Sequence, residues 1–316
     1  MKDDKSLFGH GRALEITNYV LLFAASLSVL VALALPLIAN IIKPDAQSLN
    51  QGLQEEVVVE DAQDQTVDGP AEPEEKLESK PADNQDLSWR DADFAVDPAR
   101  QDWNEDVVDR KVVYLTIDDG PSENTQAVLD ILDRYGCKAT FFVVGHNPDY
   151  YHLIGEAYRR GHTIGLHTYS HDYETVYSSV DAYYADLDAI GQVVKEQIGY
   201  VPCFIRFPGG SSNEVSANYS VGIMSVLVDS VREQGYQYYD WNMSTGDGAE
   251  HTADEIVGYA TQPTEYQNIV LLCHDSATKQ STVEALPRII EHYQSLGYTF
   301  EAIDRNTIVT HHGVNN

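Results

Sequence analysis

Residues 112–121 read VVYLTIDDGP, and this stretch decides how the rest of the chain is interpreted. The run at 112–117 is β-branched and apolar, which predicts a strand. Two aspartates and a Gly-Pro turn follow directly. Residues 124–135 then carry apolar side chains at helical spacing, and Gly136 suits the end of that helix. The stretch therefore predicts a strand, a polar turn and a helix in succession.

The same alternation continues to the C-terminal end of the sequence. Further strands are expected at 139–145, 163–167, 203–207, 237–243, 269–273 and 298–303. Helical patterns lie between them, the longest over 179–198. Seven βα repeats favour a parallel α/β sheet closed into a distorted, TIM-like (β/α)7 barrel.

Composition excludes several classes of protein. The chain has 316 residues, 43% of them hydrophobic, which is enough for a sizeable core. Its net charge of -30 argues against nucleic acid, because a protein that follows phosphates needs a basic face. The three cysteines make neither a disulfide framework nor a cysteine-rich zinc site. A metal would have to be held by His and carboxylates.

The sequence divides into four parts. Residues 1–18 form a tail, expected to be cytoplasmic. Residues 19–42 contain no charged side chain and are long enough to span a bilayer as an anchor helix. Residues 43–106 carry 5 basic and 19 acidic residues and are expected to be a flexible acidic linker. Residues 107–316 form the globular domain.

The apolar segment 19–42 also sets the expected location. Lys2, Lys5 and Arg12 precede it and only Lys43 follows closely, which places the N-terminus in the cytoplasm and the globular domain outside the membrane. The alternative is a cleaved signal peptide and a secreted protein, but the apolar run is longer than such a peptide needs.

Polar side chains follow nearly every expected strand at the point where the strand ends. They are Asp118 and Asp119, His167 and His171, Arg206, Trp241 and Asp247, and His274 with Asp275. In a βα barrel the carboxyl ends of all strands meet at one face, so these distant residues are expected to share a cleft.

His167 and His171 have the spacing i, i+4, which on a helical turn would point both imidazoles the same way. A carboxylate from another strand would complete a set of two His and one Asp. Such a set suits zinc or another divalent ion in hydrolysis.

Five motifs carry a family resemblance: TIDDGPS, HTYSH, RFPGGSS, DWNMSTGD and LLCH, in this order. They resemble the motifs of the polysaccharide deacetylases (carbohydrate esterase family 4, the NodB homology domain), over residues 108–305. The N-terminal segments resemble those of membrane-anchored members from Gram-positive bacteria, many of which act on peptidoglycan.

The resemblance implies a role for each polar group. Asp119, His167 and His171 would hold one divalent metal ion, Zn²⁺ or else Co²⁺ or another ion. Asp118 would be the general base toward the attacking water, and His274 the general acid toward the leaving amine.

Other positions would support these groups. Asp247 would orient His274, and Arg206 would pair with Asp118 and keep it ionised. The backbone N–H of Gly209, after Pro208, would donate to the oxyanion. Trp241 would either line the sugar pocket or pack in the core.

Two departures concern the pocket. The family often has an aromatic residue after the motif-3 proline, where this chain has Gly209-Gly210, and often a Trp after the motif-4 aspartate, where it has Gly248. Tyrosines that include Tyr173 and Tyr177 would form part of a sugar-binding rim or merely cover a helix.

The function that the resemblance implies is removal of N-acetyl groups from an acetylated cell-wall glycan, GlcNAc or MurNAc of peptidoglycan. Two alternatives remain at this point: an esterase that removes O-acetyl groups, and a membrane-tethered glycan-binding module without catalysis. No oligomeric state follows from the sequence.

Overall fold

The buried run that opens the domain forms strand β1 (Val112–Asp118) of the computed structural model, which describes residues 88–316. β1 pairs in parallel with β7 (Asn268–His274) along one side. Its other side pairs with β8 (Thr299–Phe300) near its start and with β2 (Ala139–Val143) toward its end. Every residue of β1 is buried, as expected for a parallel strand covered on both faces.

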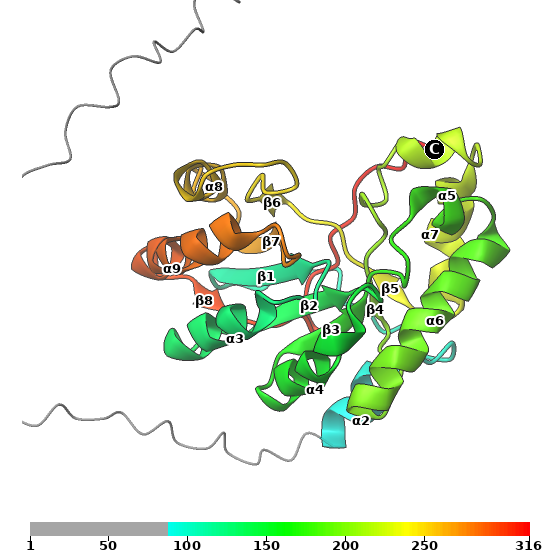
Figure 1. The fold of residues 1–316 in the computed structure, drawn as a ribbon, viewed down its shortest axis with the longest axis horizontal. Helices are drawn as coiled ribbons and strands as arrows, with labels where there is room; N and C mark the ends of the chain where they lie inside the picture. The colour runs from blue at the N-terminus through cyan, green and yellow to red at the C-terminus, as the bar shows by residue number, and fades with distance from the viewer. Residues whose placement is uncertain (1–87) are drawn as a thin grey trace, which may run out of the picture. The chain divides into compact units, whose positions relative to one another are not determined.

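The sheet extends from this strand to two edges. Beyond β2 come β3 (Thr163–Leu166), β4 (Phe204–Ile205) and β5 (Gln237–Tyr238), and beyond β7 comes β6 (Met243–Ser244). All of these pairs are parallel. The carboxyl ends of the strands therefore lie together at one end of a curled sheet (Figure 1).

The expected single strand at 237–243 is wrong. The Tyr239 N–H still bonds to Ile205 O at 3.0 Å, next to β4, but the Asn242 N–H bonds to Val270 O at 3.1 Å, in β7. The chain thus changes partner within three residues, giving two short strands at opposite edges. Among the described residues no strand pairing joins β5 to β6. The parallel sheet is therefore curled but open there, rather than closed into the expected barrel.

The C-terminal segment occupies this opening. The Asp240 N–H bonds to Thr310 O at 2.8 Å, and His311 stacks on Tyr238 with ring centroids 3.7 Å apart. In Figure 1 the segment runs between β7 and β5. It closes the opening by backbone and ring contacts without adding a strand.

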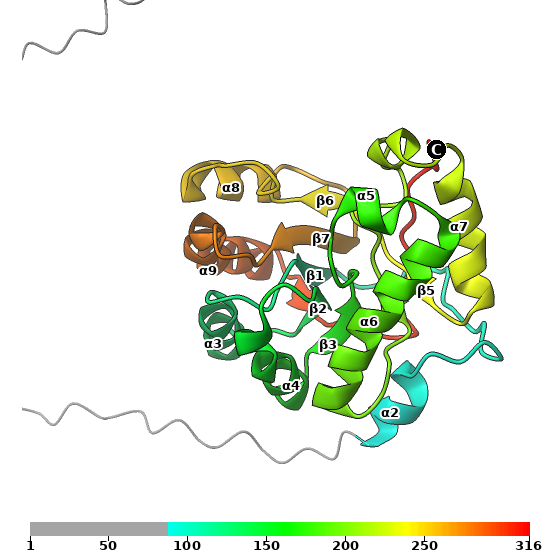
Figure 2. The same cartoon turned by 45° about the vertical axis from the view of Figure 1, so that its right-hand side comes forward.

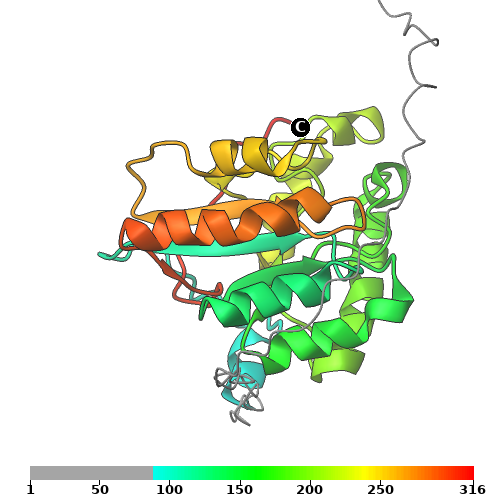
Figure 3. The ribbon, with the colours of Figure 1, turned by 60° about the vertical axis from the view of Figure 1, so that its left-hand side comes forward.

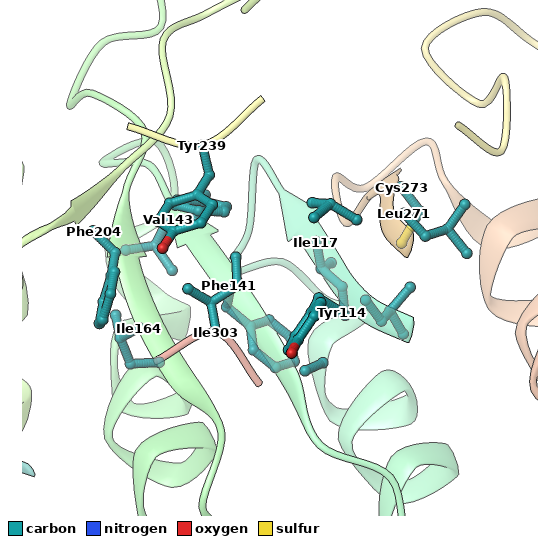
Figure 4. Packing of buried hydrophobic residues seen from close by; sticks show 14 of the residues in the cluster. Tyr114, Ile117, Phe141, Val143, Ile164, Phe204, Tyr239, Leu271, Cys273 and Ile303 are labelled. Atoms are coloured by element: carbon teal, nitrogen blue, oxygen red, sulfur yellow. The ribbon is translucent and has the colours of Figure 1, made fainter. Parts of the chain in front are cut away.

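Helices surround the sheet (Figure 2). They are α3 (Thr125–Arg134), α4 (His152–Arg159), α5 (Tyr173–Val176), α6 (Val180–Ile198), α7 (Ile223–Glu233), α8 (Ala253–Ala260) and α9 (Gln280–Ser295), with 3₁₀ turns η1 (Pro148–Tyr150) and η2 (Val215–Asn218). Figure 3 shows α9 lying along the sheet beside β1. Their apolar faces and the strands enclose one continuous core, to which β1–β4, β7 and Ile303 all contribute (Figure 4).

The folded domain begins before the predicted boundary at residue 107. α2 (Ser88–Phe94) falls in the expected linker, yet Phe94 is buried with its ring centroid 5.0 Å from that of Phe204. The Cys203 N–H also bonds to Phe94 O at 2.7 Å. Because of these contacts, residues 88–106 belong to the domain and not to a free linker. The segment has few apolar residues in an acidic sequence, which is why it was predicted to be linker. The rest of that linker, 43–87, lies outside the described residues.

Replacing Phe94 with Ala is expected to lower the free energy of unfolding by about 3–5 kcal/mol, because a buried aromatic ring leaves a cavity against β4. Denaturant unfolding of the full chain measures this loss. Val107→Ala, at a side chain that is 59% exposed, is the control and should change stability by less than about 0.5 kcal/mol. An unchanged unfolding midpoint for Phe94→Ala would show that this segment is part of the linker and does not stabilise the domain.

The predicted anchor at 19–42 and the tail at 1–18 also lie outside the described residues. Within residues 88–316, none of the helices combines the length and the apolar character that crossing a bilayer requires.

Candidate active site

The structure brings the predicted polar residues together at the carboxyl ends of the strands. Asp118 ends β1 and Asp119 follows it, while His167 follows β3 and Arg206 follows β4. His274 ends β7, and Asp247 follows β6. This convergence follows from the parallel order of the strands, because each strand delivers its next residues to the same edge of the sheet.

Asp119, His167 and His171 form a compact donor set. Asp119 Oδ1 lies 3.5 Å from His171 Nε2 and 3.7 Å from His167 Nε2, and the three donor atoms lie within 4.8 Å of one another. Asp119 Oδ1 is buried and has no hydrogen-bond partner. A buried carboxylate oxygen without a donor is costly unless a cation satisfies it. Two imidazoles and a carboxylate are ligands that zinc accepts, so the residues fit a divalent ion.

The orientation of His167 favours the same use. Its Nδ1–H donates to Arg206 O at 2.7 Å, which leaves the lone pair of Nε2 directed toward Asp119. Burial, and after it the nearby His171, lower the pKa of His167 to about 3. The ring is therefore neutral at pH 7, as a metal ligand must be.

The two histidines do not lie on a helical turn, so that expectation was wrong. Residues 167–172 form a loop, in which Thr168 has φ 93° and His171 has φ 47°. Asp119 has φ 72°. Such left-handed conformations are unfavourable for residues with a Cβ, and at functional sites the surrounding structure imposes them. Here the buried carboxylate of Asp186, on α6, accepts hydrogen bonds from the backbone of Tyr169 and Ser170 and fixes the loop.

Asp118 lies next to the donor set and is almost completely buried. Its Oδ1 accepts a hydrogen bond from Arg206 Nη1 at 2.9 Å, and its Oδ2 lies 3.7 Å from His167 Nε2. Burial raises the pKa of Asp118, and the charge of Arg206 opposes this without outweighing it. The predicted ion pair between Arg206 and Asp118 is thus present. Because burial outweighs it, the Asp118 carboxylate is a stronger base than an exposed aspartate.

Arg206 is held inside the sheet on every side. Its Nη1 also donates to Thr116 Oγ1, its Nε to Tyr239 O, and its Nη2 to Asp240 O, all at 2.7–2.9 Å. Its guanidinium lies 4.4 Å from the centroid of the Phe142 ring. These contacts fix the arginine and, through it, the position of the Asp118 carboxylate.

His274 and Asp247 form the second charged pair. His274 Nδ1 lies 2.7 Å from Asp247 Oδ1, and Asp247 Oδ2 accepts hydrogen bonds from the His274 N–H and from Thr282 Oγ1, both at 2.8 Å. Burial alone would lower the pKa of His274, but the hydrogen bond and charge of Asp247 outweigh it and raise this pKa. The arrangement stabilises a protonated imidazole, the form that donates a proton.

The loop after β4 contains the predicted oxyanion donor. Gly209 has φ 75°, and within residues 88–316 its N–H has no hydrogen-bond acceptor. Tyr177 Oη donates to Pro208 O at 2.8 Å and so anchors the loop. Trp241 is half-buried and packs edge-on against His312, with ring centroids 4.7 Å apart. Its ring also lies next to Gly210.

The two glycine positions that depart from the family pattern have different surroundings. A Cβ built on Gly248 would meet only His274 Cε1, at 3.9 Å, so the space beside the acid is open. A Cβ built on Gly209 would lie 2.5 Å from Tyr173 Oη. Burial, and after it the charge of Asp119, raise the pKa of this tyrosine.

Three contributing residues were assigned no role from the sequence, although Asp240 begins the motif DWNMSTGD and Asp275 follows His274 at a strand end. Asp186 fixes the His167–His171 loop, and the fully buried Asp240 accepts hydrogen bonds from Ser211 N and His312 N, both at 2.8 Å. The third is Asp275, whose carboxylate accepts hydrogen bonds from Ser122 and Thr125. Burial, partly offset by these bonds, raises the pKa of Asp275 to about 6. Asp240 and Asp275 adjoin Trp241 and His274 in the sequence, whereas Asp186 lies on α6, away from every motif. Nothing in the local sequence shows which groups these three carboxylates bind.

The arrangement separates two kinds of proton chemistry. A buried carboxylate, Asp118, lies beside the candidate metal-ligand set, and a histidine held by its own carboxylate lies on the neighbouring strand. Such groups could serve as a base and an acid in hydrolysis.

Comparison with known proteins agrees with this geometry. The family model "Polysaccharide deacetylase" matches residues 105–223. Two proteins of Bacillus cereus, each called peptidoglycan-N-acetylglucosamine deacetylase, are 30% and 31% identical to the chain. The matches cover 61% of this chain in both cases, and 70% and 86% of those proteins.

Solved structures are similar as well. The catalytic domain of a peptidoglycan N-acetylglucosamine deacetylase from Eubacterium rectale is 41% identical, with a TM-score of 0.65, over 70% of this chain and all of that one. A polysaccharide deacetylase from Bacillus cereus is 29% identical, with a TM-score of 0.55, over 65% of this chain and 97% of that one. The resemblance seen in the five motifs is thereby confirmed, and the chain belongs to the polysaccharide deacetylase family.

Proposed function

We propose that this chain is a metal-dependent hydrolase that removes N-acetyl groups from GlcNAc residues of peptidoglycan. One observation carries the proposal: the set of Asp119, His167 and His171 lies beside a buried base, Asp118, which is paired across the sheet with His274, a histidine held by Asp247. The names of the relatives favour GlcNAc over MurNAc.

The chain's own groups divide the work as follows. Asp119, His167 and His171 would hold the ion, for which we propose Zn²⁺. When bound, such an ion polarises the acetyl carbonyl and activates water. Asp118 accepts the proton of the attacking water, and the Gly209 N–H donates to the developing oxyanion. His274 then protonates the leaving amine nitrogen, without which the amine would leave poorly.

The acid distinguishes this function from the two alternatives. An ester leaves without an obligatory proton donor, and a binding module needs neither a base nor an acid. The Asp247–His274 pair, bonded at 2.7 Å with the Asp247 carboxylate buried, therefore favours an amide substrate.

The membrane association that the sequence predicts is part of the proposal. The uncharged run at 19–42 would anchor the chain with its N-terminus in the cytoplasm, and the acidic residues that follow would extend the domain toward the cell wall.

Metal-dependent acetyl release from peptidoglycan fragments is the expected result for the purified full chain. Mass spectrometry of the products identifies the sugar that loses the acetyl group. A chelator should reduce the rate to background, and added Zn²⁺ should restore it. His171→Ala should lose the bound metal, whereas His152→Ala, an exposed histidine on α4, should keep it. Absence of acetyl loss from any N-acetylated glycan, or faster release from O-acetylated ones, would contradict the proposal.

A further inference from the structure

Tyr173 is the first residue of α5, and its hydroxyl lies against Gly209 in the loop after β4. We propose that its ring forms a wall of the acetamide pocket and that its hydroxyl is a second hydrogen-bond donor to the acetyl oxygen, beside the Gly209 N–H. This inference rests on the proposed deacetylase function and names a substrate-binding residue for it.

The first support is the contact with Gly209. A Cβ at this glycine would lie 2.5 Å from Tyr173 Oη, so the hydroxyl stands directly against the glycine α-carbon. A side chain at 209 would require the Tyr173 hydroxyl to move. The glycine and the tyrosine are thus complementary, and the missing motif-3 aromatic is replaced by a ring that comes from α5.

The second support is that this ring is held in place. Asp172 caps α5 by accepting a hydrogen bond from the Thr175 N–H at 3.0 Å, and Tyr177, just after α5, bonds to Pro208 O. The Tyr173 ring lies edge-on between its neighbours, with centroids 5.9 Å from His171 and 5.5 Å from Tyr177. The motif-2 and motif-3 loops are therefore joined through α5, and Tyr173 is its first residue.

The third support is that the hydroxyl has nothing to bond to within the protein. Among residues 88–316, Tyr173 Oη makes no hydrogen bond, although the side chain is half-buried. A phenol is protonated at neutral pH and offers one donor. Tyr173 Oη thus lies against Gly209, and the Tyr173 ring lies 5.9 Å from that of the proposed ligand His171. Both donors, the Gly209 N–H and Tyr173 Oη, are therefore available for an oxyanion in our proposal.

Tyr173→Phe and Tyr173→Ala test the two parts of the proposal in the full chain. Loss of the hydroxyl alone should lower kcat by about 10- to 100-fold with little change in KM, because the donor acts mainly in the transition state. Loss of the ring should also raise KM by about tenfold, because substrate binding weakens as well. Tyr266→Phe, at an exposed tyrosine just before β7 at the opposite end of the strands, is the control. Kinetics of both Tyr173 variants equal to those of the control would overturn the proposal.

Gly209→Ala provides an independent test, because its methyl group would displace the Tyr173 hydroxyl. It should reproduce the lower kcat of Tyr173→Phe, and the double variant Gly209→Ala/Tyr173→Phe should be little worse than either single one. Gly222→Ala is the matched control. Gly222 has φ 81° but no atom within 4 Å of its Cβ, so it tests backbone strain alone. A fully additive double variant would show that the two positions act separately.

A binding measurement separates this inference from the proposed function. Calorimetry with an N-acetylglucosamine oligosaccharide should show about tenfold weaker binding to Tyr173→Ala than to the unaltered chain, whether or not acetate is released. If the unaltered chain binds but releases no acetate, the deacetylase function fails while the pocket wall stands. If Tyr173→Ala binds as tightly as the unaltered chain, the pocket wall fails.

Discussion

Replacing Asp118 with Asn is expected to lower the rate of acetate release by about 10²- to 10⁴-fold, the usual contribution of a general base. The amide keeps the shape of the side chain and can still accept from Arg206, but it cannot take a proton from water. Asp118 is not in the proposed ligand set, so the bound metal should remain. Measurement of both acetate release and metal content on the same preparation checks this expectation.

A control must separate two effects of Asp118→Asn: the loss of the general base and the loss of the ion pair with Arg206. Removing one partner of a buried ion pair costs about 3–5 kcal/mol, so Asp118→Asn also lowers stability. Thr116→Val removes another acceptor of Arg206, bonded at 2.7 Å, without touching the base. It should destabilise the fold but keep the rate within about tenfold. A rate for Asp118→Asn that matches Thr116→Val would show that Asp118 is not the base.

The parts of the fold that could be predicted are those that a pattern in the local sequence determines. β1 and β7 were placed to within about one residue, because strands buried on both faces are continuous apolar runs. The change of partner at Asp240 was not predictable, since it depends on where the edges of β4 and β7 lie. α2 was missed because its few apolar anchors stand in an acidic, linker-like sequence.

The site residues also fall into those that the sequence predicts and those that depend on tertiary packing. Residues that follow strands could be gathered from the sequence, because parallel topology alone brings them to one edge. The conformation of the His167–His171 loop could not, since Asp186 fixes it from a helix further along the chain. The contact of Tyr173 with Gly209 is also set by packing between loops. Its only sequence signal is the paired occurrence of a glycine where an aromatic is usual and a tyrosine two residues after His171.

Replacing Asp247 with Asn is expected to lower acetate release at pH 7 by about 10²-fold and to shift the high-pH limb of the rate profile to lower pH. His274 must be protonated to act as the acid, so activity falls as the pH rises through its pKa. Burial lowers this pKa, and Asp247 is what raises it above the ordinary value. Without the carboxylate only the effect of burial remains, and the imidazole loses its proton at lower pH. The amide of Asn can also donate an N–H to His274 Nδ1, whereas the carboxylate only accepts. Such a donor favours a neutral imidazole with its proton on Nε2.

Thr282→Val separates the charge of Asp247 from its position. It removes the hydrogen bond from Thr282 Oγ1 to Asp247 Oδ2 but leaves the carboxylate and its bond to His274 intact. Its high-pH limb should stay close to that of the unaltered chain, with a rate loss below about tenfold, because one neutral hydrogen bond contributes only about 1 kcal/mol. If Asp247→Asn instead loses rate equally at every pH, the carboxylate only holds the ring in place. If the limb moves to lower pH in Asp247→Asn alone, the negative charge of Asp247 is what keeps His274 protonated for the leaving amine.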